Sequence, residues 1–329
     1  MKKWNVVIAV GISLILMALS SCDDSESSVR SIPNAAALQA MTDENTEAKI
    51  QHFTIDATAG GQITGQHGTI VKFPASAFLT SENGVVTGSV DIEFIEIYTR
   101  SSMLLTQRPT TGKKSDGTKA MLVSGGEFYV HATKGNSILK PSATYSIIVP
   151  TKNTGGTNLD MNMFTGVEEC ENDKCNLVWE EQKDRKMEIG EFQTAGGIFS
   201  AYYAIQSKFG WTNIDRWYSD PRTKTTIFVE VPSGFDNKNC AVYIIYDGEP
   251  TALGQFDRYD EKTKRFTEHY GLIPVGLNVH IILVSIINDE IHYAIKSAVI
   301  TENHVEVISD GDVHAITQEE LVALIDDLP

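Results

Sequence analysis

One ten-residue segment combines aromatic and polar side chains in a pattern that could bind a ligand. It reads FGWTNIDRWY and runs from Phe209 to Tyr218. Rings can cover the apolar faces of a sugar while polar groups bond its hydroxyls. The candidate ligand-binding residues are therefore Trp211, Asn213, Asp215, Trp217 and Tyr218. The same composition suits a strand whose Trp residues cover a core and whose Asp215 and Arg216 fix a turn, and this structural interpretation is favoured.

Motifs of the common hydrolases are absent from the sequence. It has no Gly-x-Ser-x-Gly elbow, no His-Glu-x-x-His, no Ser-x-x-Lys with suitable companions and no phosphate-binding loop. The paired carboxylates of a glycosidase have no short signature, so that class stays open. The sequence predicts no catalytic residues and favours a non-enzymatic binding or structural module. The alternative is a carbohydrate-binding or polysaccharide-processing accessory protein.

Metal ligands are not concentrated anywhere in the chain. The eight histidines are scattered, and a hairpin turn at Asn288-Asp289 would place His280 and His292 on opposite faces of a sheet. Acidic turns at 246–249, 257–261 and 309–312 could supply oxygen ligands to Ca²⁺, but none has the twelve-residue pattern of a helix-loop-helix site. Solvated turns are the favoured interpretation, so no cofactor is predicted and calcium is the alternative.

Two of the four cysteines are close in sequence. Cys170 and Cys175 can close a small loop in an oxidising compartment, which predicts a disulfide. Zinc is the alternative, although one such pair without a nearby histidine lacks a full ligand set. Cys240 falls in an expected strand, where an unpaired cysteine usually behaves as a small buried hydrophobe.

The first 21 residues have the order of an export signal. Lys2 and Lys3 precede an apolar run from Val6 to Leu19, and small residues follow before Cys22. The run is about 14 residues long, whereas a transmembrane helix needs about 20. Residues 1–21 are therefore expected to be a cleaved signal peptide.

The sequence Leu19-Ser20-Ser21-Cys22 resembles the lipobox of bacterial lipoproteins. The resemblance implies cleavage before Cys22 and acyl chains on that cysteine, which would anchor the protein to a membrane. Removing residues 1–21, which hold two lysines and no acid, moves the formal net charge from −16 to −18. Such a surface repels phosphates, so nucleic acid is an unlikely partner and a protein or glycan ligand is expected.

The remaining pattern predicts a mainly β protein. Residues 22–50 are polar and are expected to form a flexible tether, and apolar runs separated by Gly, Asn and Pro follow. We expect two β-sandwich-like domains, at 51–150 and 206–312, joined by an irregular region at 151–205. A bulge or strand end near Ile95 would explain a shift in alternation. Residues 313–329 should form a C-terminal helix, because Thr317 and Glu320 make a capping box.

Two segments resemble known groups of proteins. Residues 60–78, which begin with Gly60-Gly61, resemble the opening of the β-sandwich domain shared by zona occludens proteins, netrin receptors and ankyrins, although Ser76 stands where that family usually has Gly. Segments at 124–128, 163–166 and 210–216 resemble outer-membrane lipoproteins of the Bacteroidota phylum. In that group, acids after the lipidated cysteine, here Asp23, Asp24 and Glu26, accompany display on the cell surface. The resemblance implies an outer-membrane lipoprotein exposed on the cell surface, with the periplasmic face as the alternative.

Overall fold

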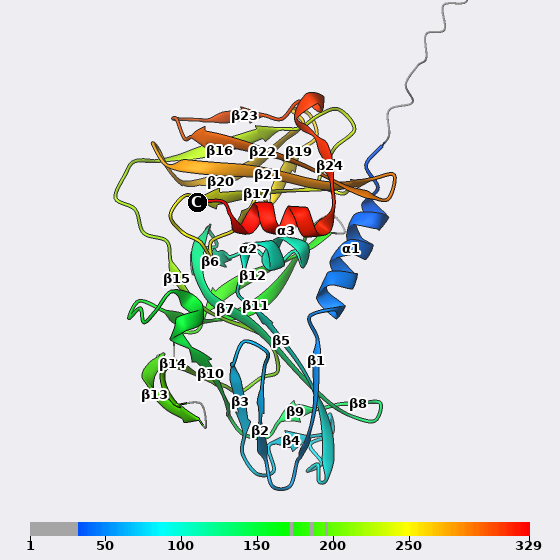
Figure 1. The fold of residues 1–329 in the computed structure, drawn as a ribbon, viewed down its shortest axis with the longest axis vertical. Helices are drawn as coiled ribbons and strands as arrows, with labels where there is room; N and C mark the ends of the chain where they lie inside the picture. Colours follow the sequence, from blue (N-terminus) through cyan, green and yellow to red (C-terminus); the bar gives the residue numbers. More distant parts are fainter. Residues whose placement is uncertain (1–31, 172–173, 184–186, 195–196) are drawn as a thin grey trace, which may run out of the picture. The chain divides into compact units, whose positions relative to one another are not determined.

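The chain folds mainly into β-strands, as its alternating apolar pattern predicts (Figure 1). The computed structural model describes residues 32–171, 174–183, 187–194 and 197–329. The expected signal peptide, the lipidation residue Cys22 and the tether up to residue 31 lie outside the described residues. No helix within the described ranges is long and apolar enough to cross a lipid bilayer.

The largest sheet gathers strands from distant parts of the sequence. In spatial order they are β1 (Gln51–Asp56), β5 (Ser89–Ile97), β7 (Lys119–Lys134), β15 (Gly210–Trp217), β11 (Asn162–Glu171), β12 (Lys174–Glu181) and β6 (Thr111–Lys113), with β8 (Ser137–Ile138) paired to β7. Strand β6 pairs with both β12 and β7. Strands β7, β15, β11, β12 and β6 therefore form a closed circuit of paired strands, a small barrel within the sheet.

A second sheet packs on the first and completes a sandwich. Its order is β13 (Glu188–Thr194), β14 (Gly197–Gln206), β10 (Tyr145–Pro150), β3 (Ile70–Phe73) and β2 (Gly61–Thr64). One hydrophobic cluster contains side chains from both sheets, among them Val71, Ile92, Phe128 and Ile147. A two-stranded sheet of β4 (Phe78–Leu79) and β9 (Lys140–Pro141) lies beside this core.

Two further sheets form a second sandwich. One has the order β19 (Arg258–Asp260), β20 (Arg265–Pro274), β16 (Lys224–Glu230) and β23 (Val305–Val307); the other has the order β18 (Gly254–Gln255), β17 (Cys240–Tyr246), β21 (Asn278–Ile287), β22 (Glu290–Val299) and β24 (His314–Ile316). Their shared core includes Val229, Val242, Phe266 and Ile281. The expected register of the β21–β22 hairpin is confirmed, because Ser285 lies opposite His292 and Ser297 lies opposite His280.

Within the part of the chain that the structure describes, three helices pack between and beside the sandwiches. They are α1 (Ala35–Glu47), α2 (Arg100–Leu105) and α3 (Gln318–Asp326), and there are single 3₁₀ turns at η1 (Thr151–Thr154) and η2 (Asp310–Asp312). Figure 1 shows α3 beside α2. The expected capping box at Thr317 and Glu320 is present, and Leu321 and Ile325 of α3 are buried in a core shared with α2 and β17. The C-terminal helix therefore docks on the body of the protein.

The expectation that residues 22–50 form a flexible tether is wrong for residues 35–47. Residues 35–47 form α1, which the Asn34 side chain caps by accepting from the N–H of Ala37 at 3.1 Å. Leu38 is buried against the body, and the Gln107 amide donates to Thr42 Oγ1 at 2.8 Å. A short isolated helix is marginal in water, but docking supplies the stabilisation that the segment alone lacks.

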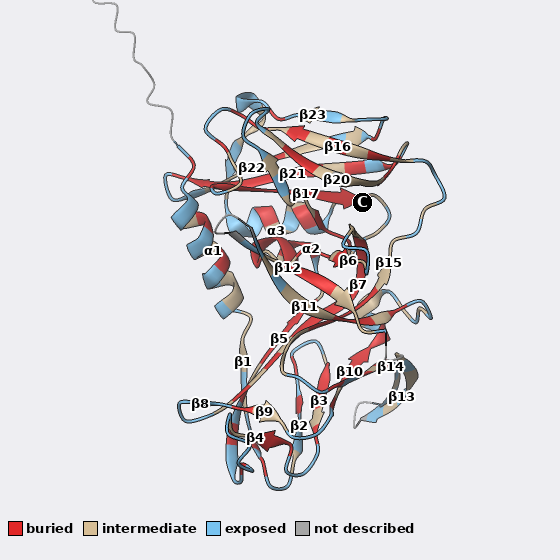
Figure 2. Ribbon diagram, turned by 180° about the vertical axis from the view of Figure 1, so that it is seen from behind, coloured by how far each residue is buried: buried red, intermediate tan, exposed pale blue. Residues whose placement is uncertain are grey.

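Two other expectations are corrected. Residues 151–205, expected to be irregular, supply β11 to β14, and β15 pairs with β7 and β11 instead of opening the second block. No bulge interrupts the pairing of β5 with β7 at Ile95. The alternation disappears there because both faces of β5 are covered: Phe94 points into the first sandwich, whereas Ile95 and Ile97 pack in the core with α2 and α3. Figure 2 shows buried residues, in red, along β5 and β7.

Candidate functional site

Strand β15 carries four of the five residues predicted to bind a ligand, Tyr218 directly follows it, and the structure separates the five side chains. Side chains alternate along a strand, so Trp211, Asn213, Asp215 and Trp217 share one face. Asn213 and Asp215 are completely buried, whereas Trp211, Trp217 and Tyr218 are partly exposed. The two polar residues in the middle of the segment therefore cannot contact a ligand held at the surface.

A bulge in β7 makes room for these buried groups. Gly125 and Gly126 of β7 lie opposite the single residue Ile214 of β15. Gly126 has φ of +124°, and a Cβ there would lie 2.6 Å from the Phe128 ring. Glycine is therefore required at this position for the bulge to form.

Asn213 and Asp215 form a buried acidic cluster with Glu127, which lies opposite Asn213 on β7. The Asn213 amide donates to Asp215 Oδ2 at 2.6 Å, but both Glu127 oxygens, Asn213 Oδ1 and Asp215 Oδ1 have no hydrogen-bond partner within the described part of the chain. Burial raises the pKa of Asp215 to about 7, against hydrogen bonds from Asn213 and Ser124 that lower it. Burial and the nearby Asp215 charge raise the pKa of Glu127 well above its usual value, so both acids bind protons more readily than exposed carboxyls do.

Trp211 is mainly a packing residue. Its ring lies 5.2 Å from that of Tyr129 and 6.4 Å from that of Trp179, measured between centroids. The Arg108 guanidinium lies 5.0 Å from the Trp211 ring centroid, and burial lowers the pKa of Arg108 although the Glu127 charge raises it. These contacts agree with the structural interpretation of this part of the segment.

Trp217 lines a groove on the surface, separate from the one that Trp211 lines. Its ring packs edge-to-face on Phe164 at 5.5 Å, and its Nε1 donates to Glu181 Oε2 at 3.0 Å. A Cβ on Gly112 would lie 2.7 Å from the ring, so glycine at that position allows the indole to lie close to β6. The Trp217 ring is therefore held in one orientation before any ligand arrives.

The groove beside Trp217 has a volume of about 900 Å³. We call it the Trp217 groove, and it is lined by residues 113–117, 180, 181, 183 and 217–219. Lys114 Nζ lies 5.7 Å from the ring centroid, and Lys113 Nζ lies 3.1 Å from Glu180 Oε1. An aromatic surface bordered by carboxylates and ammonium groups can cover an apolar sugar face and bond the surrounding hydroxyls.

The turn between β6 and β7 forms one side of this groove. Asp116 Oδ1 accepts from the N–H of Thr118 at 2.9 Å and from its hydroxyl at 2.7 Å, and Gly117 has φ of +85°. An Asp side chain that bonds the backbone two residues later is a common turn device. This device fixes the backbone that carries Lys114 at the groove.

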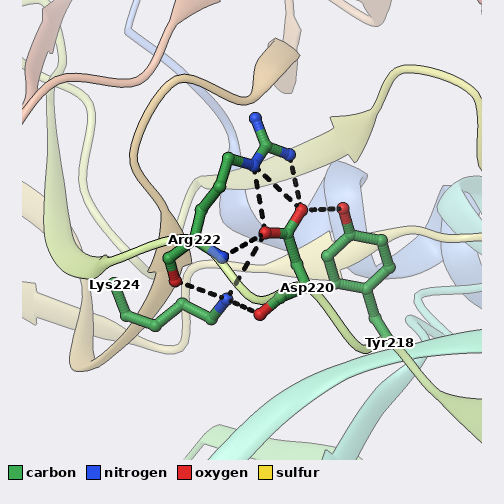
Figure 3. Close-up of polar contacts among 4 residues, drawn as sticks. All are labelled: Tyr218, Asp220, Arg222 and Lys224. Carbon is green, nitrogen blue, oxygen red and sulfur yellow. Dashed lines mark hydrogen bonds and ion pairs between the residues drawn. The ribbon is translucent and has the colours of Figure 1, made fainter.

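Tyr218 is held by a network of charged groups that Figure 3 shows. Its hydroxyl donates to Asp220 Oδ2 at 3.1 Å, and Arg222 Nε donates to Asp220 Oδ1 at 3.0 Å. Lys224 Nζ donates to the carbonyl oxygens of Asp220 and Arg222. The hydrogen bonds from Arg222 hold the pKa of Asp220 well below its usual range, so the carboxylate that orients Tyr218 is ionised at neutral pH.

Tyr218 and Lys114 also line a second, more enclosed cavity. It has a volume of about 100 Å³ and lies against the core of the second sandwich. Its lining includes Glu268 of β20, which no motif in the sequence marks as a candidate. Glu181 and Glu127 were also missed, because each is one acid in an ordinary strand and gains its surroundings from strands far away in sequence.

The acidic turns considered for calcium are engaged in other contacts. Asp247 Oδ1 lies 2.9 Å from His280 Nδ1, Asp260 accepts from the N–H of Lys262 at 2.8 Å, and Asp312 lies 3.0 Å from Lys296 Nζ. Within the described ranges no group of three or more His, Cys, Asp or Glu side chains could hold a metal ion.

The predicted disulfide between Cys170 and Cys175 is confirmed. The two residues are directly opposite each other in the β11–β12 hairpin, with their Cα atoms 4.0 Å apart. Cys240 is buried in β17, as expected, and its thiol donates to the Asp236 carbonyl oxygen at 3.1 Å.

Comparison with known proteins does not assign a role to the groove. No protein-family model matches the sequence, and no curated protein matches it. Among solved structures, the chain is similar to gamma-CGTase from alkalophilic Bacillus clarkii, with 10% sequence identity and a TM-score of 0.19. The match covers 78% of this chain and 40% of that chain, and a TM-score this low supports no conclusion about fold or function.

Proposed function

We propose that this protein is a lipoprotein of the outer membrane, anchored through Cys22, whose β-rich body binds a carbohydrate in the Trp217 groove without transforming it. The observation that carries the proposal is the fixed, partly exposed indole of Trp217 in a groove of about 900 Å³. Ligand pockets of about 300–1,000 Å³ are typical for small molecules and short oligomers.

The polar groups around the indole suit a hydroxylated ligand. Glu181 already orients the ring through Nε1, and its carboxylate has further acceptor capacity for a sugar hydroxyl. Lys183 and Ser219 at the groove add donors. Because the acidic protein as a whole repels anions, a neutral glycan is the expected ligand class.

The binding test uses the mature chain, residues 22–329, with Cys22→Ser to keep it soluble. A glycan array identifies a ligand, and calorimetry then compares Trp217→Ala with the unmodified groove. Loss of an aromatic stacking surface worth about 1.4 kcal/mol weakens binding about tenfold. Trp217→Phe keeps a ring and should retain more of the affinity than Trp217→Ala.

Tyr203→Ala is the matched control, since this partly exposed ring of β14 packs on Phe192 and does not line the Trp217 groove. Circular dichroism confirms that each variant is folded. Equal glycan affinity for Trp217→Ala and the parent chain would refute the groove as the binding site.

The anchor is tested separately in cells. Cys22→Ala should release the protein from the membrane fraction, and protease treatment of intact cells should remove the body if it faces outward. Protection until the cells are lysed would place the body in the periplasm and direct the search to glycans of the envelope.

A further inference from the structure

The enclosed cavity next to the Trp217 groove contains one carboxylate whose partners are incomplete. The cavity is lined mainly by apolar and aromatic groups, including Met121, Ile244, Phe256 and Ile273. Glu268 projects from β20 into this lining. Its Oε1 accepts from the N–H of Tyr270 at 3.2 Å, whereas its buried Oε2 has no hydrogen-bond partner within the described part of the chain.

Of the three lysines in the lining, Lys119 and Lys224 already contact other acceptors, and Lys114 lies over the Trp217 ring. Lys119 Nζ lies 2.9 Å from Asp257 Oδ2 and 3.0 Å from Glu169 Oε2. Lys224 Nζ donates to two backbone carbonyl oxygens and lies 3.7 Å from Asp220 Oδ1. Neither of these two lysines forms an ion pair with Glu268, so they leave the Glu268 carboxylate in the cavity wall without a cationic partner.

Aromatic rings complete the surroundings. Tyr218 and Tyr246 line the cavity with their rings edge-to-face, 4.8 Å apart between centroids. The faces of such rings carry partial negative charge and attract cations. A cavity with aromatic rings and a carboxylate that lacks a partner therefore suits an organic cation better than an anion or a neutral acceptor.

We propose that this cavity binds a small primary ammonium ion with an apolar substituent, whose ammonium group bonds Glu268 and whose substituent packs on Met121, Phe256 and Ile273. The small volume of about 100 Å³ restricts the ligand to a compact amine. This site does not depend on carbohydrate binding in the Trp217 groove, although Lys114 and Tyr218 line both.

Binding should depend on pH through Glu268. Burial raises the pKa of Glu268 to about 7, against N–H groups of Leu272, Tyr270 and Gly271 that lower it. The ionised fraction therefore rises from about one tenth at pH 6 to about nine tenths at pH 8, and affinity for the amine should rise about tenfold.

Other titratable groups of the lining do not produce this change. Burial raises the pKa of Tyr218, Tyr246 and Tyr270, which keeps these phenols neutral over this range. Burial favours neutral Lys119, but its hydrogen bonds to Asp257 and Glu169 raise its pKa overall, so it stays charged. The remaining charged groups of the lining are Asp257, which is paired with Lys119, and the lysines Lys114 and Lys224.

The test measures binding of butylamine and phenethylamine to the mature Cys22→Ser chain by ligand-observed NMR at pH 6 and pH 8. The corresponding alcohols are the matched neutral probes. The proposal expects at least one amine to bind at least tenfold more tightly than its alcohol at pH 8. Equal binding of amine and alcohol, or no binding of either amine at millimolar concentration, would overturn it.

Glu268→Gln should weaken amine binding at least tenfold at pH 8 and remove its pH dependence, whereas Glu230→Gln, outside the cavity, should leave both unchanged.

Gly254→Ala is a second variant that keeps Glu268. Its methyl group would lie 2.8 Å from Met121 Cε, so the flexible methionine must move and reduce the cavity. If either variant is folded and still binds the amine as tightly as the parent chain, the assignment of the cavity is refuted. Loss of glycan binding in Trp217→Ala with retained amine binding would show that the two sites are separate.

Discussion

The buried cluster of Asp215, Asn213 and Glu127 should contribute stability in acid that is lost as the pH rises past neutral. In the folded state burial raises the pKa of Asp215 to about 7, whereas its usual value is 3.8. The folded state therefore binds a proton more tightly than the unfolded state. The resulting stabilisation is fully present below pH 4, and it is lost as the pH rises through 7.

The expected size follows from the difference of about three pH units. At about 1.4 kcal/mol per unit, Asp215 lowers the free energy of unfolding by about 4 kcal/mol in total between acid and alkaline pH. About 2–3 kcal/mol of this falls between pH 5 and pH 8. Glu127 contributes in the same direction, because its pKa is also raised.

Asp215→Asn isolates this contribution, since a neutral amide resembles the protonated carboxyl in shape and hydrogen-bonding capacity. The variant should lose about 2–3 kcal/mol of the pH dependence between pH 5 and pH 8, and at pH 8 it should be at least as stable as the parent. Urea unfolding of the mature Cys22→Ser chain at both pH values measures this. Asp91→Asn, at an exposed position of β5, is the control. If Asp215→Asn keeps the full pH dependence of the parent, the cluster does not hold its protons in the way described.

Two further predictions concern the disulfide of the β11–β12 hairpin and the docking of α1. Replacing both Cys170 and Cys175 by Ser should lower the free energy of unfolding by about 2 kcal/mol, because the closed loop is short; urea unfolding measures it, and a loss above about 4 kcal/mol would show that the hairpin needs the link to fold. Leu38→Ala should lower stability by about 2–4 kcal/mol if α1 is docked in solution. Gln39→Ala, on the exposed side of α1, should change it by less than about 0.5 kcal/mol, and equal effects of the two substitutions would contradict docking.

Local patterns in the sequence predicted the features that depend on near neighbours. The turn at Asn288-Asp289 determined the register of its hairpin, the pair Thr317 and Glu320 marked the start of α3, and Cys170 and Cys175 were near enough to pair. In each case the interacting groups are separated by a few residues. The physical information needed was therefore present in a short window.

Features that depend on distant pairings could not be predicted in this way. Asp215 and Glu127 are 88 positions apart and meet because β15 pairs with β7. The alternation of β15 showed which residues share a face, but not that the face is covered. Glu268 likewise looks like a solvent-exposed acid of an alternating strand until β17 and β7 supply the walls of its cavity. The sequence therefore predicted part of the candidate site: Trp217 and Tyr218 line a groove, whereas Asn213 and Asp215 are buried.

Strand β7 links the stability of the two sandwiches. Met121 and Val123 at one end belong to the core of the second sandwich, and Phe128 and Val130 at the other end belong to the core of the first. Neither core is complete without this strand, so neither half of the chain should survive as a separately expressed fragment. Heating should produce a single calorimetric transition whose van't Hoff and calorimetric enthalpies agree. The slowest amide exchange should occur along β7, because its central hydrogen bonds open when the whole body unfolds.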